Sequence, residues 1–173
     1  MRKALQSLRS AAYHEAGHAV AAFQMGVKTE AILLIAKDGS PGRHSLRSYI
    51  GGMSRNLGRG PRAQRRAENL ALVCLAGPAA QRRFSPKSIR RYTSETDRRQ
   101  AIDLLSRFTN SDEELRAYCR LLEARTRRTI ARPEAWRLVE GLADRLLEKG
   151  SMTGAEVGQV IRESSLQSAR PKD

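Results

Sequence analysis

Five consecutive residues near the start of the chain, His14-Glu15-Ala16-Gly17-His18, have the pattern H-E-x-x-H. Because residues i and i+4 leave the same face of a helix one turn apart, both imidazoles point in one direction. Two nitrogens placed in this way suit a zinc ion, and a Glu beside the first of them can take a proton from water held by the metal. The pattern predicts a peptide-hydrolysing centre with His14 and His18 as ligands and Glu15 as the general base.

A zinc ion needs a third protein ligand, and the spacing of residues does not choose it. Residues 19–24 contain no ligand, which excludes the longer metzincin motif. The one other histidine, His44, lies in a turn-rich stretch that favours an exposed loop residue, so a downstream carboxylate is the better candidate. Asp97 lies three residues after Ser94, and this spacing suits either a ligand near a helix start or an ordinary capping residue.

The motif lies in an alanine-rich stretch over residues 3–25, which we expect to be a helix that ends before Gly26. Residues 30–36 form a short apolar run typical of a strand. A Gly-Ser-Pro-Gly turn at 39–42 and a weaker strand candidate at 45–50 follow. These segments predict a small hairpin or a two-stranded sheet.

The remaining chain has helical patterns. Residues 62–84 predict a helix that Pro78 kinks or splits. Residues 111–150 predict two helices that meet near Pro133. Three pairs with the spacing of an N-cap and an acidic residue mark helix starts: Ser94 and Asp97, Ser111 and Glu114, and Thr153 and Glu156. We therefore expect a mainly α fold with a small β-sheet, of the α+β class, over residues 1–165, and a flexible polar tail over 166–173.

The length of 173 residues corresponds to one domain, and 40% apolar residues with a mean hydropathy of −0.55 indicate a globular chain. The sequence contains no export signal and no apolar run of about 18 residues, so we expect no membrane span and a cytoplasmic location. Cys74 and Cys119 have neither metal-type spacing nor a disulfide-rich context, which predicts buried thiols in a reducing compartment.

The chain carries 32 Lys and Arg against 18 Asp and Glu, a formal charge of +14. Residues 55–99 hold twelve basic and three acidic residues, so they account for +9 of this excess. Such a segment is either a solvated helix face or a surface for an acidic partner, which includes peptide, nucleic acid and lipid headgroups. Aromatic residues make up only 5% and are not interleaved with the basic runs, which argues against stacking on single-stranded nucleic acid.

Several segments, in order and spacing, resemble the protease domain of FtsH-type ATP-dependent zinc metalloproteases. They are Ala12-Tyr13-His14-Glu15-Ala16-Gly17-His18-Ala19, the strand 32–35, Leu75-Ala76-Gly77-Pro78-Ala79-Ala80-Gln81, Thr93-Ser94-Glu95-Thr96-Asp97, and a closing helix-turn-helix over 146–156. The resemblance covers about residues 9–163.

The resemblance implies a zincin-like, mostly helical metalloprotease domain that binds Zn²⁺. It implies His14 and His18 as ligands, Glu15 as the catalytic base and Asp97 as the third ligand. It also implies that an edge strand binds the substrate by main-chain hydrogen bonds. That edge is the segment 44–50, with Ser45, Leu46 and Arg47 as the substrate-strand candidates.

Two departures from the family pattern qualify this expectation. The sequence has no G-x-x-x-x-G-K-[ST] segment, so we expect no ATP hydrolysis by this chain and cleavage of peptides, loops or unfolded segments, unless a separate ATPase partner feeds it. Gln81 stands where the family has an acidic residue, and metal affinity falls if that position supports a ligand. The family forms hexameric rings through parts that include the ATPase module, so a homo-oligomer is left open.

Two functions from different classes follow. The first is a zinc endopeptidase whose substrates are peptides or unfolded protein segments, with acidic ones favoured by the charge. The alternative is a catalytically weak or inactive module of the same fold that binds acidic partners or nucleic acid through residues 55–99. The presence of His14, Glu15, His18 and Asp97 together favours the peptidase, because a module without catalysis does not require them.

Overall fold

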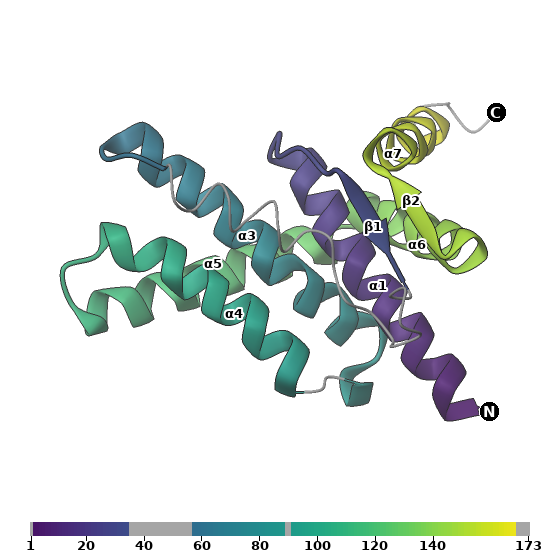
Figure 1. Cartoon of the computed structure of the whole chain (residues 1–173), viewed down its shortest axis with the longest axis horizontal. Coiled ribbons are helices and arrows are strands. Elements are labelled where there is room, and N and C mark those ends of the chain that lie inside the picture. The colour runs from purple at the N-terminus through teal and green to yellow at the C-terminus, as the bar shows by residue number, and fades with distance from the viewer. Residues whose placement is uncertain (1, 35–56, 89–90, 169–173) are drawn as a thin grey trace.

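The computed structural model describes residues 2–34, 57–88 and 91–168 (Figure 1). In chain order the elements are α1 (Arg2–Gln24), β1 (Ala31–Leu33), α3 (Pro61–Phe84), the 3₁₀ turn η1 (Pro86–Ser88), α4 (Arg91–Leu105), the 3₁₀ turn η2 (Ser106–Phe108), α5 (Asp112–Ala131), α6 (Pro133–Lys149), β2 (Ser151–Thr153) and α7 (Gly154–Ser168). The described part is therefore mainly helical with one small sheet, as the sequence predicts.

The centre of the molecule is the pair α1 and α3. Small residues line their contact: a Cβ added to Gly17 of α1 would lie 2.6 Å from the Cβ of Ala80 and 2.7 Å from the carbonyl oxygen of Ala76. Distances this short show that the two helix backbones approach closely, as only small residues allow. The H-E-x-x-H segment lies on α1 at this contact and is consequently held by a rigid neighbour.

The other helices cover the pair from two sides. α6 packs against α1, while α4 and α5 pack against α3, so that α1 lies between α6 and the α3–α5 group (Figure 1). On α6 the residues Val139, Ala143 and Leu146 are fully buried and Trp136 is half-buried, which confirms the predicted apolar face. The polar residues of the motif are thus enclosed by several helices rather than by one surface groove.

The sheet joins two distant parts of the sequence. β1 pairs antiparallel with β2, with Ile32 opposite Met152, and both of these side chains are buried. Two flanking bonds extend the pairing, from the Leu34 N–H to the Gly150 carbonyl at 2.8 Å and from the Gly154 N–H to the Glu30 carbonyl at 2.7 Å. Residues 151–153, expected to be a turn between two helices, therefore form a strand. The sequence did not predict this strand because three residues are too few to show an alternation of apolar and polar side chains.

Several helix boundaries differ from expectation. Pro78 does not split α3, which continues from Pro61 to Phe84, because packing on three neighbouring helices holds the backbone where one hydrogen bond is lost. α4 begins at Arg91 rather than at Ser94, so Asp97 lies well inside the helix. α7 includes residues 166–168, which the sequence placed in the tail.

Two predicted caps are confirmed. The Glu114 N–H donates to Ser111 Oγ at 3.1 Å at the start of α5. Thr153 and Glu156 form a reciprocal capping box, in which the Thr153 N–H donates to Glu156 Oε2 at 2.8 Å and the Glu156 N–H to Thr153 Oγ1 at 3.3 Å. Local side-chain chemistry of this kind is readable from sequence because both partners lie within one turn.

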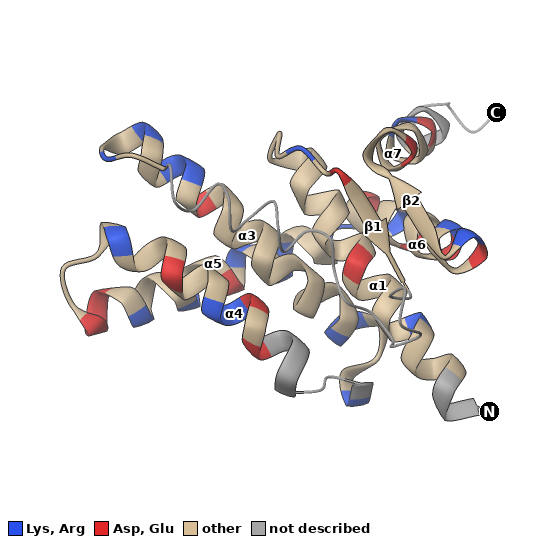
Figure 2. Cartoon of the chain, viewed as in Figure 1, with Lys and Arg blue, Asp and Glu red and all other residues tan. Residues whose placement is uncertain are grey.

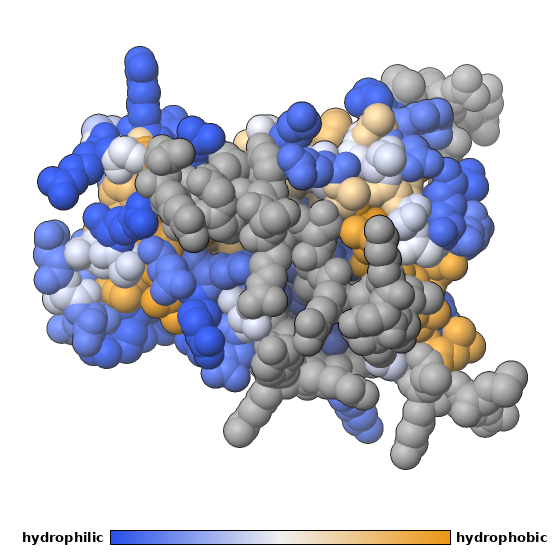
Figure 3. Space-filling view, in the orientation of Figure 1, coloured by the Kyte–Doolittle hydropathy of each residue, from blue (hydrophilic) through white to orange (hydrophobic). Residues whose placement is uncertain are grey.

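Apart from the buried Glu15 and Asp97, the charged side chains of the described residues are not buried. Figure 2 shows Lys and Arg on the outer parts of α3, α4 and α5, and the surface over these helices is largely hydrophilic in Figure 3. Cys74 and Cys119 are both buried and free, as predicted. No helix in the described ranges is long and apolar enough to cross a bilayer.

Candidate metal centre

Side chains from two helices, α1 and α4, meet in the interior. His14 and His18 come from α1 and Asp97 from α4, and their relative exposures are 3%, 4% and 8%. Among the described residues they form the one group of at least three His, Cys, Asp or Glu side chains whose ligand atoms converge, all within 4.8 Å of one another. Glu15 is 1% exposed, so this carboxylate also lies in the interior.

The distances among the three ligand atoms match the requirements of a small tetrahedral cation. His14 Nε2 and His18 Nε2 lie 3.0 Å apart, and Asp97 Oδ2 lies 3.2 Å from the first and 3.7 Å from the second. Ligands about 2.0–2.1 Å from a tetrahedral zinc ion are separated by about 3.3 Å. The triangle of donor atoms therefore has the right size to be spanned by one zinc ion.

The opposite nitrogen of each imidazole is fixed by a hydrogen-bond acceptor. His14 Nδ1 lies 2.9 Å from Gln81 Oε1, and His18 Nδ1 lies 2.7 Å from the Val73 carbonyl oxygen. An N–H at each Nδ1 donates to these oxygens, which leaves the lone pairs of both Nε2 atoms facing each other and Asp97. Three converging lone pairs repel one another unless a cation or a proton lies among them, so the donor set itself indicates a cation site.

α3 supplies the surface against which His18 packs. A Cβ added to Gly77 would lie 2.6 Å from both Cδ2 and Cε1 of the His18 ring, a distance that Cβ atoms do not adopt. Any larger residue at position 77 would therefore displace the imidazole. Val73, Gly77 and Gln81 follow one another at four-residue spacing, so a single face of α3 positions both histidines.

The carboxylate and the imidazoles shift one another's pKa values. Burial alone would lower the pKa of His18, but the nearby Asp97 carboxylate outweighs it, and with Glu15 and the Val73 carbonyl raises that pKa to about 9. Burial would likewise raise the pKa of Asp97, yet His18 and His14 hold it well below its usual range. With a pKa raised to about 9, His18 is favoured in its protonated form near neutral pH when no cation is bound.

Cys74 lies close to this group but has a different chemistry. Burial, together with the charge of Asp97, raises the pKa of the Cys74 thiol far above its ordinary value. Its Sγ lies 3.9 Å from Gln100 Oε1, to which the thiol donates. The residue is thus a protonated, buried thiol and not a further ligand, since a thiol binds metal as the thiolate.

The structure brings His14, His18 and Asp97 together, buries Glu15 near enough for its charge to act on His18, and leaves other predicted residues untested. His14, Glu15, His18 and Asp97 share one interior region, and the position of Asp97 inside α4 removes the alternative that it is an N-terminal cap. His44, Ser45, Leu46, Arg47 and the turn at 39–42 lie outside the described residues.

Two supports of the site were not predicted from sequence. The Val73 carbonyl has no sequence signal, because any residue supplies a carbonyl. Gly77 had one weak signal, a glycine inside a helical pattern, which often marks close packing.

Compared with models of known protein families and with curated proteins, the chain gives no match.

Proposed function

We propose that this protein is a zinc-dependent endopeptidase, with His14, His18 and Asp97 as the ligands and Glu15 as the general base. The observation that carries the proposal is the convergence of His14 Nε2, His18 Nε2 and Asp97 Oδ2 at mutual distances of 3.0–3.7 Å, with both Nδ1 atoms oriented by acceptors. Three protein ligands with a neighbouring carboxylate are typical of catalytic zinc sites, which keep one position for water or substrate.

Each residue has a defined task in this proposal. A zinc ion held by the three ligands supplies Lewis acidity, which polarises a carbonyl and makes water a stronger acid. Glu15 accepts the proton of the attacking water and returns it to the leaving amine nitrogen. Gln81 and Val73 keep each imidazole in the orientation that presents Nε2. The low exposure of the group strengthens these electrostatic interactions, because little water screens them.

The resemblance to FtsH-type protease domains supports peptide bonds as the substrate. The sequence contains no G-x-x-x-x-G-K-[ST] segment for nucleoside triphosphates. The proposal therefore assigns this chain ATP-independent cleavage of peptides, exposed loops or unfolded segments.

The test is the change Glu15→Gln, which removes the base and keeps the shape of the side chain. We expect one zinc ion per chain in both proteins by elemental analysis, and cleavage of an unfolded fluorescent protein substrate by the unchanged protein alone. Loss of a general base lowers rates by about 10²–10⁴-fold. Glu113→Gln, an exposed residue in the first turn of α5, is the matched control and should cleave normally. Undiminished cleavage by the Glu15→Gln protein would overturn the assignment.

A further inference from the structure

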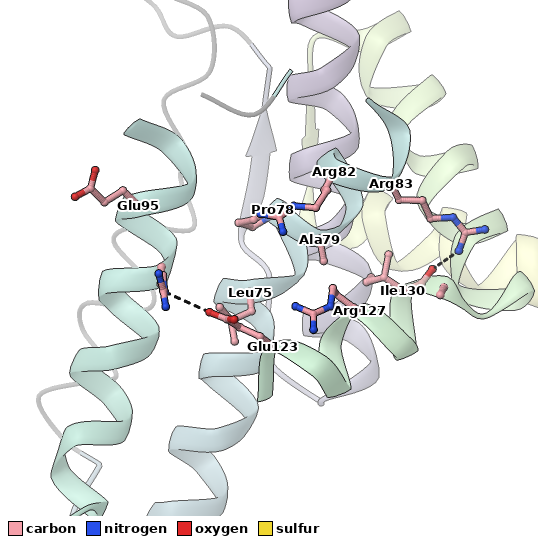
Figure 4. Close-up of a pocket in the computed structure, with 11 residues that line it drawn as sticks. Leu75, Pro78, Ala79, Arg82, Arg83, Glu95, Glu123, Arg127 and Ile130 are labelled. Atoms are coloured by element: carbon pink, nitrogen blue, oxygen red, sulfur yellow. Dashed lines mark hydrogen bonds and ion pairs between the residues drawn. The ribbon is translucent and has the colours of Figure 1, made fainter. Parts of the chain in front are cut away.

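A cavity lies across α3 from the metal centre. It has a volume of about 800 Å³ and is bordered by α3, α4 and α5 (Figure 4). From α3 it is lined by Leu75, Ala79 and Arg82, whereas Val73, Gly77 and Gln81 face the histidines. Since these two sets lie on opposite sides of one helix, the cavity is separated from the metal ligands by the thickness of α3, about 10 Å. We call it the arginine groove.

Four arginines line the groove, and they are held differently. Arg83 donates to the Ile130 carbonyl at 2.9 Å and stacks over Trp136, with its Cζ 4.3 Å from the ring centroid. Arg98 pairs with Glu123 at 3.2 Å. The side chains of Arg82 and Arg127 form no hydrogen bond or ion pair with any of the described residues.

These two guanidinium groups come from different helices, α3 and α5, and border the same space (Figure 4). Neither is neutralised by the carboxylates of the groove. Glu123 is engaged by Arg98, and Glu95 lies at the edge and points away from Arg82 and Arg127 in Figure 4. The groove therefore has two solvated cations available for an anionic ligand.

The wall between these cations is apolar. Leu75, Pro78, Ala79, Ile130 and Ala131 line it, and no aromatic residue in the described part of the chain does. A nucleic acid requires a longer track of cations and gains from aromatic stacking, neither of which the groove supplies. An acidic peptide fits better, because its carboxylates pair with guanidinium groups and a side chain between them contacts the apolar wall.

We propose that the arginine groove binds an acidic peptide segment, with Arg82 and Arg127 pairing with its carboxylates and the Leu75–Ala79 side of α3 contacting an apolar residue between them. A peptide bound in the groove is held one helix away from the metal centre, so the groove could anchor a substrate for cleavage. Only this consequence for cleavage rests on the proposed function. Binding itself requires neither zinc nor Glu15, so each proposal can fail without the other.

The experiment measures binding of a fluorescein-labelled peptide of alternating Glu and Leu by anisotropy, with the metal-free protein in low salt. We expect the double change Arg82→Glu with Arg127→Glu to weaken binding at least tenfold, and a peptide with Gln in place of Glu to bind at least tenfold more weakly. The matched control is Arg65→Glu with Arg120→Glu. These residues are exposed on α3 and α5, do not line the groove, and change the net charge equally. Circular dichroism and urea unfolding of both double variants show whether each remains folded, without reference to zinc.

Three results would overturn the proposal. The first is equal loss of binding in both double variants, which assigns the effect to net charge alone. The second is equal binding of the Glu and Gln peptides. The third is a single-stranded RNA that binds the unchanged protein more tightly than the acidic peptide and displaces it. In contrast, selective loss in the Arg82 and Arg127 variant, with an intact Glu15→Gln protein that still binds the peptide, supports a groove that is independent of catalysis.

Discussion

The two faces of α3 hold polar groups in opposite ways. Toward α1, the helix presents Gly77 and the small residues Ala76 and Ala80, and it gives each buried imidazole a fixed hydrogen-bond acceptor. Toward the groove, it presents Arg82, whose charged end is exposed and forms no hydrogen bond or ion pair with the described residues. One helix therefore borders a buried, closely packed cluster on one side and a solvent-exposed cavity on the other.

The two sides of α3 have opposite structural requirements. A metal centre needs donor atoms fixed to within a few tenths of an ångström, which requires packing without spare volume. A peptide groove needs unsatisfied charge and room, which require solvent. Small substitutions on the face toward α1 should therefore have large effects on zinc affinity and stability, whereas substitutions on the groove face should have small ones.

The largest effect is expected for Gly77→Ala. The new Cβ would lie 2.6 Å from two atoms of the His18 ring, so the imidazole must move away from its position. We expect at least a 100-fold loss of zinc affinity and a loss of about 1–3 kcal/mol in the free energy of unfolding, as for other overpacked cores. Zinc competition with a chromophoric chelator and urea unfolding measure the two quantities.

Gly141→Ala is the matched control for that change. Gly141 is also inside a helix, but the nearest atom to its added Cβ is Ser164 Oγ at 3.7 Å, an ordinary contact. Alanine is the better helix former, so this variant should gain up to about 1 kcal/mol and bind zinc normally. Equal behaviour of the two alanine variants would contradict the tight packing of His18.

The next effect concerns Gln81. In the Gln81→Leu protein the His14 Nδ1–H loses its acceptor at 2.9 Å, so the imidazole is no longer held in the ligand orientation. Zinc affinity should fall about 10–100-fold, the usual cost of losing such a support. Gln81→Glu should restore or exceed the original affinity, because a carboxylate accepts more strongly. If the Leu and Glu proteins bind zinc alike, Gln81 does not orient His14.

A smaller effect is expected from pH. Zinc must displace the proton from His18, whose pKa Asp97 raises to about 9 against the burial that would lower it, so zinc affinity should rise about tenfold per pH unit between pH 6.5 and 8. Calorimetry in buffers of different ionisation enthalpy should show release of about one proton per zinc at pH 7. Zinc uptake without proton release would contradict a protonated His18.

In the metal-free protein, the stability contributed by His18 falls as the pH rises, which is opposite to the pH dependence of zinc affinity. The contribution of His18 to stability is complete below its ordinary pKa of 6.5 and is lost as the pH rises through about 9. Asp97, with its depressed pKa, contributes above its ordinary value of 3.8 and loses that contribution as the pH falls. Urea unfolding in a chelator should therefore show this pair to be most stabilising between about pH 4 and 6.5.

The smallest effect is expected on the other face of α3. Arg82→Gln with Arg127→Gln removes two exposed charges without partners among the described residues, so the free energy of unfolding should change by less than about 0.5 kcal/mol. Zinc affinity should also stay the same, because α3 separates these side chains from the ligands. A large loss of stability in urea would show that the groove arginines hold the fold together.

Local patterns account for what could be predicted. The H-E-x-x-H segment placed His14, Glu15 and His18 on one helix, and the cap pairs at Ser111 and Thr153 marked two real helix starts. All of these signals act within one or two turns. The cap pattern at Ser94 was misleading, because the same residue types occur inside α4.

Near-neighbour patterns in the chain were enough to predict the helices, two histidines spaced for one metal ion and a carboxylate beside them, and composition showed the excess of arginine. Only the tertiary structure decided which carboxylate meets the histidines, that Val73 and Gln81 orient them, and that β1 pairs with a strand about 120 residues later. It also decided that Arg82 and Arg127 share one groove. The physical reason is the separation of the interacting residues in the sequence. Helical periodicity and capping depend on near neighbours, whereas the cluster of three donor atoms and the groove form where helices distant in sequence pack together.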